Sequence, residues 1–367
     1  MSSRYPIEVH AKQSPTPAAE LAKVLSSPLG FGQVFTDHMV CIPYREGEGW
    51  LSGELKPYAP ISLDPAAMVL HYGQSVFEGF KAFKRDDGSI ATFRPDANAR
   101  RFQRSARRLA MAELPIEAFV DASDLLIAQD REWVPTAKGT SLYLRPLLIA
   151  TERCLGVRPA REYLFILLAS PAGDYFSGGV RPVKVWVCDE YVRAAPGGTG
   201  EAKCGGNYAA SLVAQAEAAR HGCAQVVWLD AIQHTNVEEM GGMNIFFVEQ
   251  RQGTTTLVTP KLTGSLLPGI TRESLLAIGP ELGYVVEERT VTVNEWVEKA
   301  SSGEMTEAFA CGTAAVITPI GIVKHRGGEL TMGDGQGGPV AQRLREHLLS
   351  LQYGHIADKH GWMHPVC

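Results

Sequence analysis

The stretch GTGEAKCGGNYAAS, residues 198–211, surrounds a single lysine, Lys203, with small residues. Residues 197–203 have an outline similar to a phosphate-binding P-loop. That motif requires glycine before the lysine and serine or threonine after it, whereas Ala202 and Cys204 occupy these positions. The lysine therefore needs an explanation other than a P-loop.

A lysine amine acts as a nucleophile only when neutral, and its ordinary pKa of about 10.4 keeps it charged near pH 7. Burial or a neighbouring cation lowers that pKa, as in lysines that form Schiff bases. Gly205 and Gly206 would leave room for a flat aromatic ring and permit positive φ angles, and the phenol of Tyr208 could bind a ring oxygen. The alternative is a surface lysine in a turn, and this stretch alone favours that alternative.

The composition is that of a globular protein and excludes several classes of function. Hydrophobic residues make up 45% of the 367 residues and charged residues 20%, and this length predicts two domains. The net charge of −5 gives no indication of a nucleic-acid partner. No apolar run approaches the roughly 18 residues of a membrane span, and the N-terminal stretch lacks the hydrophobic core of a signal peptide.

The seven cysteines are well separated, and none belongs to a CxxC pair. We therefore expect neither a metal site nor a dithiol redox pair. An odd number of separated thiols suits a reducing compartment, so we expect a cytoplasmic protein.

Apolar patterns predict helices and strands in irregular order. Helices are expected at 96–114 with Asp96 as N-cap, at 120–134, at 208–221, and after Thr271 as N-cap. Strands are expected at 89–93, 141–151, 163–170, 183–189, 225–230, 243–249, 256–260 and 285–293, with a strand, turn and strand at 305–320. This order favours an α+β or mixed α/β fold over a regular doubly wound sheet.

The stretch SPAGDYFSGGVRP, residues 170–182, concentrates proline, glycine and serine between two predicted strands. It predicts a smaller N-terminal domain at 1–175, a linker at 176–180 and a larger C-terminal domain at 181–367 that carries the lysine.

Four other stretches are unusual, although each has an ordinary explanation. NVEEMGGMN (236–244) offers a carboxylate for a protonated ring nitrogen, or is an exposed turn. LLPGITRESLL (266–276) offers helix-start amides for phosphate, or a simple cap. CGTAA (311–315) offers small residues whose amides could face an anion. One arginine among residues 100–108 could turn inward to a phosphate while the others stay solvated.

Together and in this order, these stretches resemble the branched-chain amino acid aminotransferases, which are fold-type IV pyridoxal-phosphate enzymes of the class IV aminotransferase family. The resemblance extends from FTDHMV (35–40) to HGWM (360–363). It is most specific in LHYGQSVFEGFKAF, SLYLRP, YVRAAPGGTGEAKCGGNY, EEMGGMNIFF, LLPGITRESLL and ACGTAA. It implies a two-domain fold with pyridoxal 5'-phosphate in the cleft between the domains.

The resemblance implies that Lys203 carries the cofactor as a Schiff base and moves the substrate proton. It implies that Glu239, with Glu238 as its rival, holds the pyridine nitrogen protonated. The other implied cofactor contacts are Arg101, Tyr208, Ile270, Thr271, Thr313 and Arg193. Relatives often carry threonine at the position of Gly242, which would remove one hydroxyl from the phosphate site.

The same resemblance implies a pocket that accepts an apolar and an acidic side chain in turn. Tyr143 with the amides of Thr313 and Ala314 would hold the α-carboxylate. Arg145, on the same strand face as Tyr143 by the period of two, would meet the distal carboxylate of glutamate. The implied apolar wall consists of Phe31, Tyr72, Phe77 and Tyr175.

The activity implied is transfer of the amino group of L-leucine, L-isoleucine or L-valine to 2-oxoglutarate, by a ping-pong mechanism through pyridoxamine phosphate. A homodimer that shares part of the substrate pocket is expected. D-amino acid transaminases and aminodeoxychorismate lyases have a similar lysine and glutamate, and a non-catalytic protein on this fold is a third alternative. Some relatives carry a CxxC pair where this chain has Ala315 and Thr318, so no thiol switch is expected there.

Overall fold

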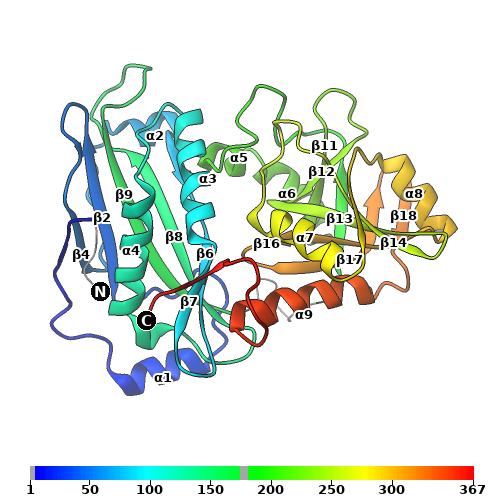
Figure 1. Ribbon diagram of the computed structural model, residues 1–367. Helices are drawn as coiled ribbons and strands as arrows, with labels where there is room; N and C mark the ends of the chain where they lie inside the picture. Colours follow the sequence, from blue (N-terminus) through cyan, green and yellow to red (C-terminus); the bar gives the residue numbers. More distant parts are fainter. Residues whose placement is uncertain (1–4, 174–180) are drawn as a thin grey trace. The chain divides into compact units, whose positions relative to one another are not determined.

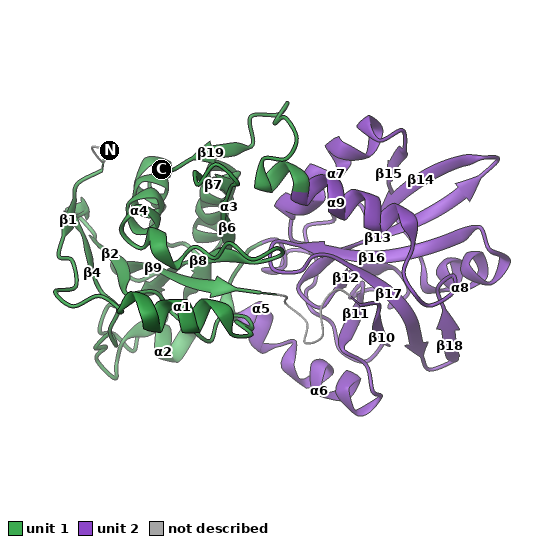
Figure 2. Cartoon of the chain, turned by 90° about the horizontal axis from the view of Figure 1, so that it is seen from below, with its two compact units in different colours: residues 1–177, 202–205, 350–367 green, residues 178–201, 206–349 purple. Residues whose placement is uncertain are grey.

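The computed structural model describes residues 5–173 and 181–367. The chain divides into two compact units, which are coloured separately in Figure 2. Unit 1 comprises Met1–Ser177, Ala202–Gly205 and Ser350–Cys367, and unit 2 comprises Gly178–Glu201 and Gly206–Leu349. The units differ from the expected domains in two places, because the lysine segment and the C-terminal residues belong to unit 1. The expected linker at 176–180 lies outside the described residues.

Unit 1 contains a ten-stranded sheet in the order β1-β4-β2-β9-β8-β6-β7-β19, with β3 on β2 and β5 on β8. Its strands are β1 (Ile7–Val9), β2 (His38–Arg45), β3 (Gly49–Trp50), β4 (Gly53–Pro57), β5 (Ser75–Phe77), β6 (Phe80–Lys84), β7 (Ile90–Phe93), β8 (Ser141–Ala150), β9 (Glu162–Ala172) and β19 (Met363–Pro365). β8 pairs with β9 over the whole length of β8. β19 pairs with β7, which ties the C-terminal residues to this unit.

The helices of unit 1 are α1 (Ala18–Ser26), α2 (Met68–Tyr72), α3 (Pro95–Arg108), α4 (Ile116–Gln129) and the 3₁₀ turn η1 (Arg131–Trp133). α3 and α4 lie side by side over the sheet (Figure 1). The core between them and the sheet is built from the aromatic side chains of Phe80, Phe102, Phe119 and Phe165, all 0–1% exposed. Because α3 packs on this core, it also brings its polar residues against β5.

Unit 2 contains a nine-stranded sheet in the order β12-β11-β10-β17-β16-β13-β14-β15, with β18 on β17. β12 also pairs with β13, so six of these strands form a closed ring. The strands are β10 (Val183–Cys188), β11 (Gln225–Leu229), β12 (Val237–Met240), β13 (Met243–Arg251), β14 (Thr254–Thr259), β15 (Val285–Glu288), β16 (Met305–Gly312), β17 (Val316–His325) and β18 (Gly328–Thr331).

The remaining helices are α5 (Gly205–Ala209), α6 (Leu212–Arg220), α7 (Ile270–Glu281), α8 (Val293–Ser302) and α9 (Pro339–Tyr353). In the described part of the chain, no helix combines the length and the apolar character needed to cross a membrane.

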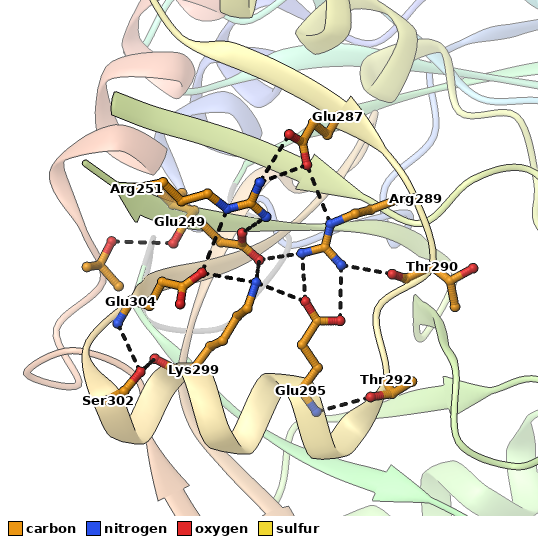
Figure 3. A network of polar contacts seen from close by, with 12 residues as sticks. Glu249, Arg251, Glu287, Arg289, Thr290, Thr292, Glu295, Lys299, Ser302 and Glu304 are labelled. Atoms are coloured by element: carbon orange, nitrogen blue, oxygen red, sulfur yellow. Dashed lines mark hydrogen bonds and ion pairs between the residues drawn. The ribbon is translucent and has the colours of Figure 1, made fainter. Parts of the chain in front are cut away.

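A buried carboxylate organises one side of unit 2. Glu249 on β13 is 0% exposed, and Arg251, Arg289 and Lys299 all donate to it (Figure 3). Its Oε1 lies 2.5 Å from Arg289 Nη2 and 3.1 Å from Lys299 Nζ. Glu295 joins the network by pairing with the same two cations. The network connects β13, α8 and the segment after β15.

The α+β fold is confirmed, and so are most expected strands, but three local predictions were wrong. Asp96 is not a cap: Arg94 is the N-cap of α3, Pro95 begins the helix, and Asp96 pairs with Arg100 one turn on. The expected helix at 208–221 is two helices, α5 and α6. Thr271 lies inside α7, whose N-cap is Gly269, because the chain approaches Asn244 too closely for a side chain at that position.

Candidate active site

Lys203 lies in the segment Ala202–Gly205, which belongs to unit 1 although the residues on both sides belong to unit 2. The Lys203 amide donates to Ser105 Oγ of α3 at 2.9 Å, and the Lys203 carbonyl accepts from the amide of Phe77 at 3.0 Å. The half-buried side chain places Nζ 4.9 Å from the centroid of the Phe77 ring. The main chain of the lysine is therefore held independently of its side chain.

The residues before and after the segment Ala202–Gly205 are joined by hydrogen bonds within unit 2. Thr199 Oγ1 donates to Asn207 Oδ1 at 2.6 Å, and Asn207 Nδ2 donates to the Thr199 carbonyl at 2.7 Å. A side chain at Gly200 would collide with the carbonyl of Ser265, which explains this glycine. Neither Thr199 nor Asn207 was expected from the sequence.

The glycines after the lysine do not adopt the positive φ angles that the sequence suggested. Gly205 and Gly206 begin α5 and are not among the residues with positive φ. A Cβ on Gly205 would lie 3.0 Å from Ser75 Oγ, so close packing is the requirement at this position.

Phe77, at the end of β5, is the centre of a cluster in unit 1. Arg145 Cζ lies 4.8 Å from the Phe77 ring centroid and 5.4 Å from that of Tyr143. Arg145 Nη2 donates to Tyr143 Oη at 3.1 Å, which confirms that these two residues of β8 share a face. Phe31 packs edge-on against Tyr143, with ring centroids 4.7 Å apart. The structure therefore brings together the ammonium of Lys203, the guanidinium of Arg145 and an aromatic surface.

Arg145 is half-buried in this cluster and lacks an anionic partner within its own unit. Among the described residues of unit 1, no carboxylate lies within ion-pair distance of its guanidinium, and its buried Nε has no hydrogen-bond partner. A buried donor without a partner costs about 1–3 kcal/mol. An anion bound beside Phe77 would remove that cost.

Gly79 explains how Tyr143 reaches this position. Any side chain at Gly79 would collide with the Tyr143 hydroxyl, so the glycine admits the phenol. Glycine therefore contributes to the site by its absence of a side chain.

One expected member of the apolar wall, Tyr72, does not lie in this cluster, and a second cannot be placed. Tyr72, at the end of α2, is 42% exposed, and its hydroxyl donates to the carbonyl of Leu155. Tyr175 lies outside the described residues.

Arg101 of α3 is 4% exposed and forms a two-pronged ion pair with Glu78, which is 0% exposed. Arg101 Nε donates to Glu78 Oε1 at 2.6 Å, and Nη2 donates to Oε2 at 2.8 Å. The sequence offered a signal that was missed, because Glu78 is a charged residue inside the apolar run SVFEGF.

In unit 2, Glu239 of β12 is 2% exposed and is bound on both oxygens. Its Oε1 accepts from the Leu267 amide at 2.7 Å, and its Oε2 lies 3.0 Å from Arg193 Nε. Arg193 also donates to the carbonyls of Gly200 and Ser265. One loop, 265–269, thus contacts both Arg193 and Glu239.

Glu238, the rival of Glu239, accepts its hydrogen bond from a hydroxyl. Ser265 Oγ donates to its Oε1, and its buried Oε2 has no hydrogen-bond partner. Burial raises the pKa of Glu238 above its ordinary value. A raised pKa makes Glu238 the weaker candidate for a permanent anion.

The N-terminus of α7 follows this loop. Ile270 and Thr271 are buried in its first turn, where main-chain amides have no partner within the helix. Asn244 Nδ2 donates to the Leu267 carbonyl at 3.0 Å, and Asn244 lies opposite Glu239 in the β12–β13 pair. The helix start therefore lies beside the strand that carries Glu239.

Tyr208, Thr313 and Ala314 lie at the same edge of the unit 2 sheet. A Cβ on Gly242, in the β12–β13 turn, would lie 3.2 Å from Tyr208 Cε1. Thr313 and Ala314 form the turn between β16 and β17, and β16 pairs Cys311 with Asn244 near this edge. The expected residues of unit 2 thus gather around the start of β13.

Known proteins are similar to this chain over most of its length. The amino-transferase class IV family model matches residues 75–323. The chain is 58% identical over 361 residues to a branched-chain-amino-acid aminotransferase of Mycolicibacterium smegmatis, with 98% of each chain covered.

Two solved structures are similar over 89% of this chain. The branched-chain amino acid aminotransferase of Escherichia coli has a TM-score of 0.73 and 30% identity, with 99% of that chain covered. The T.th. branched-chain amino acid aminotransferase complexed with N-(5'-phosphopyridoxyl)-L-glutamate has a TM-score of 0.71 and 29% identity, with 98% of that chain covered. The chain therefore belongs to the class IV aminotransferase family.

Proposed function

We propose that this protein is a pyridoxal-phosphate-dependent transaminase that moves the amino group of L-leucine, L-isoleucine or L-valine to 2-oxoglutarate. The observation that carries the proposal is the Phe77 cluster, in which Lys203 Nζ and the Arg145 guanidinium approach one aromatic ring at 4.9 and 4.8 Å. This arrangement offers an amine, an apolar surface and an anion-binding group together. The similar enzymes are described as branched-chain aminotransferases.

The residues of unit 2 fit a phosphorylated pyridine cofactor. The amides at the start of α7 suit an anion, and the close approach of Gly269 to Asn244 leaves no side chain at the cap. Glu239 offers a buried carboxylate for a ring nitrogen, and Tyr208 offers a phenol for a ring oxygen. When bound, pyridoxal phosphate supplies an electron sink that stabilises negative charge at the substrate Cα.

The protein residues would then have distinct tasks. Lys203 holds the cofactor through Nζ and, when free of it, takes and returns the proton at the substrate Cα. Arg101, Ile270, Thr271 and Thr313 bind the phosphate, and Arg193 orients Glu239 through their ion pair. Gly242 supplies no hydroxyl to the phosphate, and its Cβ-free position accommodates the Tyr208 ring.

One pocket would serve two substrates in turn, in two half-reactions. Tyr143 and the amides of Thr313 and Ala314 would hold the α-carboxylate. Phe77 and Phe31 would contact a branched side chain, and Arg145 would bind the distal carboxylate of glutamate or 2-oxoglutarate. The glutamate moiety in the T.th. complex supports this second substrate.

We further propose a homodimer. Leu70, Tyr72, Leu155 and Val157 are 59%, 42%, 64% and 86% exposed, and α2 and the loop after β8 lie side by side. Exposed apolar groups collected in this way are typical of an interaction surface. Ultracentrifugation should give twice the chain mass, and a monomer at working concentrations would reject the dimer.

A covalent test addresses the cofactor directly. Purified protein should be yellow, and borohydride reduction followed by peptide mass spectrometry should place a phosphopyridoxyl group on Lys203. An adduct on another residue, or none, would overturn the proposal. Turnover of L-leucine with 2-oxoglutarate, but not of D-alanine, distinguishes this function from a D-amino acid transaminase.

A further inference from the structure

Glu78 forms an ion pair with Arg101 but has no task in the activity proposed above. Both side chains are almost completely buried, at 0% and 4% exposure, and two short bonds of 2.6 and 2.8 Å join them. Burying two charges costs several kcal/mol per ion, and the pair offsets that cost only when its geometry is well defined. A buried ion pair is therefore weak evidence that these residues stabilise the fold, and a positioning role is the alternative.

The carboxylate of Glu78 is itself fixed by the main chain. The main-chain amide of Glu78 donates to the Pro146 carbonyl at 2.8 Å, and the Glu78 Oε2 atom accepts from the Gly79 amide at 3.1 Å. The two bonds to Arg101 use the Nε–Nη2 edge of the guanidinium, which is two of its five donors. The carboxylate therefore sets the direction of the guanidinium plane.

The helix that carries Arg101 also holds the lysine. Ser105 lies one turn after Arg101 on α3, on the same helix face, and its Oγ accepts the Lys203 amide. Phe77, which precedes Glu78, donates its amide to the Lys203 carbonyl. Three consecutive residues thus contact three different site residues. Phe77 binds the main chain of Lys203, and Glu78 binds the side chain of Arg101. Gly79 leaves room for the Tyr143 hydroxyl.

We propose that Glu78 is a positioning residue of the cofactor site, which orients Arg101 toward the phosphate. This inference rests on the proposed function, in which Arg101 binds the cofactor phosphate. Glu78 does not touch the cofactor and acts through Arg101.

The direction in which E78Q changes the dissociation constant for pyridoxal phosphate distinguishes an orienting role of Glu78 from a purely electrostatic one. Removing the negative charge of Glu78 would by itself strengthen the attraction between Arg101 and a phosphate dianion. If Glu78 orients Arg101, E78Q must instead weaken binding. We expect the dissociation constant of the full-length apo-protein for pyridoxal phosphate to rise about 10- to 100-fold, the range seen when groups that orient metal ligands are removed.

Pyridoxal, which lacks the phosphate, is the matched probe. Its dissociation constant should not change in E78Q, because the effect passes through Arg101. In a double-mutant cycle, E78Q should weaken pyridoxal phosphate binding no further in an R101M background. E78D, which keeps the charge but shortens the side chain, should also weaken pyridoxal phosphate binding. This variant replaces E78Q in the test if E78Q does not fold.

Asp130 provides the control variant, because it is a buried carboxylate of unit 1 paired with His38 at 2.5 Å. D130N should lower stability and leave both dissociation constants unchanged. Tighter or unchanged binding of pyridoxal phosphate in E78Q, equal losses for pyridoxal, or additivity with R101M would overturn the inference. Wild-type protein that binds no pyridoxal phosphate would instead overturn the proposed function.

Discussion

The main-chain amide of Lys203 donates a 2.9 Å hydrogen bond to Ser105 Oγ, so α3 holds the lysine by its backbone. K203A removes only the side chain, and we expect the fold to remain intact. Transamination should fall by more than about 10³-fold, because both the tether of the cofactor and the mobile proton carrier are lost. Circular dichroism and leucine turnover test this pair of outcomes; near-normal turnover would contradict the role of Lys203.

We predict that R145A impairs glutamate more than leucine. The guanidinium beside Phe77 has no carboxylate partner among the described residues of unit 1, and a charged hydrogen bond contributes about 1.5–3 kcal/mol. The kcat/KM for glutamate should therefore fall about 10- to 100-fold more than that for leucine. R107A, which removes an exposed arginine paired with Glu113, is the control. Equal losses for both substrates would identify Arg145 as structural.

The network around Glu249 should be a major contribution to the stability of unit 2 (Figure 3). E249Q leaves Arg251, Arg289 and Lys299 without their buried anion, and removing one partner of a buried pair costs about 3–5 kcal/mol. E304Q, which removes a more exposed carboxylate of the same network, should cost about 1 kcal/mol or less. Urea unfolding measures both, and similar losses would contradict the argument.

Asp37 should make the free energy of unfolding depend on pH in the acidic range. Burial alone would raise its pKa, but hydrogen bonds from Lys12, Thr16 and Trp133 outweigh burial and lower the pKa of Asp37 to about 2. A lowered folded-state pKa stabilises the protein fully above the unfolded value of 3.8, and this stabilisation is lost as pH falls toward about 2. The difference corresponds to about 2 kcal/mol.

D37N should therefore unfold more easily at pH 7 and should lose part of the stability slope between pH 4 and pH 2. Unfolding curves at a series of pH values measure this slope. E48Q, at an exposed carboxylate, should keep it. An unchanged slope in D37N would show that Asp37 does not carry the effect.

Activity should not respond to mild peroxide. Five of the seven cysteines are buried, and burial raises the pKa of the Cys188, Cys223 and Cys311 thiols, so the reactive thiolate is scarce. Ala315 and Thr318 are not cysteines, so these two positions form no redox pair. Turnover before and after peroxide, with and without a thiol reductant, tests this; loss that the reductant reverses would refute it.

Most strands of unit 2, and β7, β8 and β9 of unit 1, were predictable because their apolar residues alternate locally or run continuously. The shared face of Tyr143 and Arg145 follows from the same period of two. β12 was less predictable, because Glu238 and Glu239 suggest an exposed turn and only their contacts with the 265–269 loop bury them. The ends of α3 and α7 were misassigned for a related reason: a favourable cap residue was present, but Pro95 and the approach of Gly269 to Asn244 set the helix starts.

The sequence by itself determined the family, most strands of the unit 2 sheet and the lysine, because these depend on residue type and short spacing. Only the tertiary structure decided that Lys203 belongs with unit 1 and that Glu78 binds Arg101. Lys203 and Ser105 are 98 positions apart, and Arg101 and Glu78 are 23 apart. Both contacts depend on the packing of α3 against the sheet, because Arg101 and Ser105 lie on that helix while Glu78 and Lys203 lie far from it in the sequence.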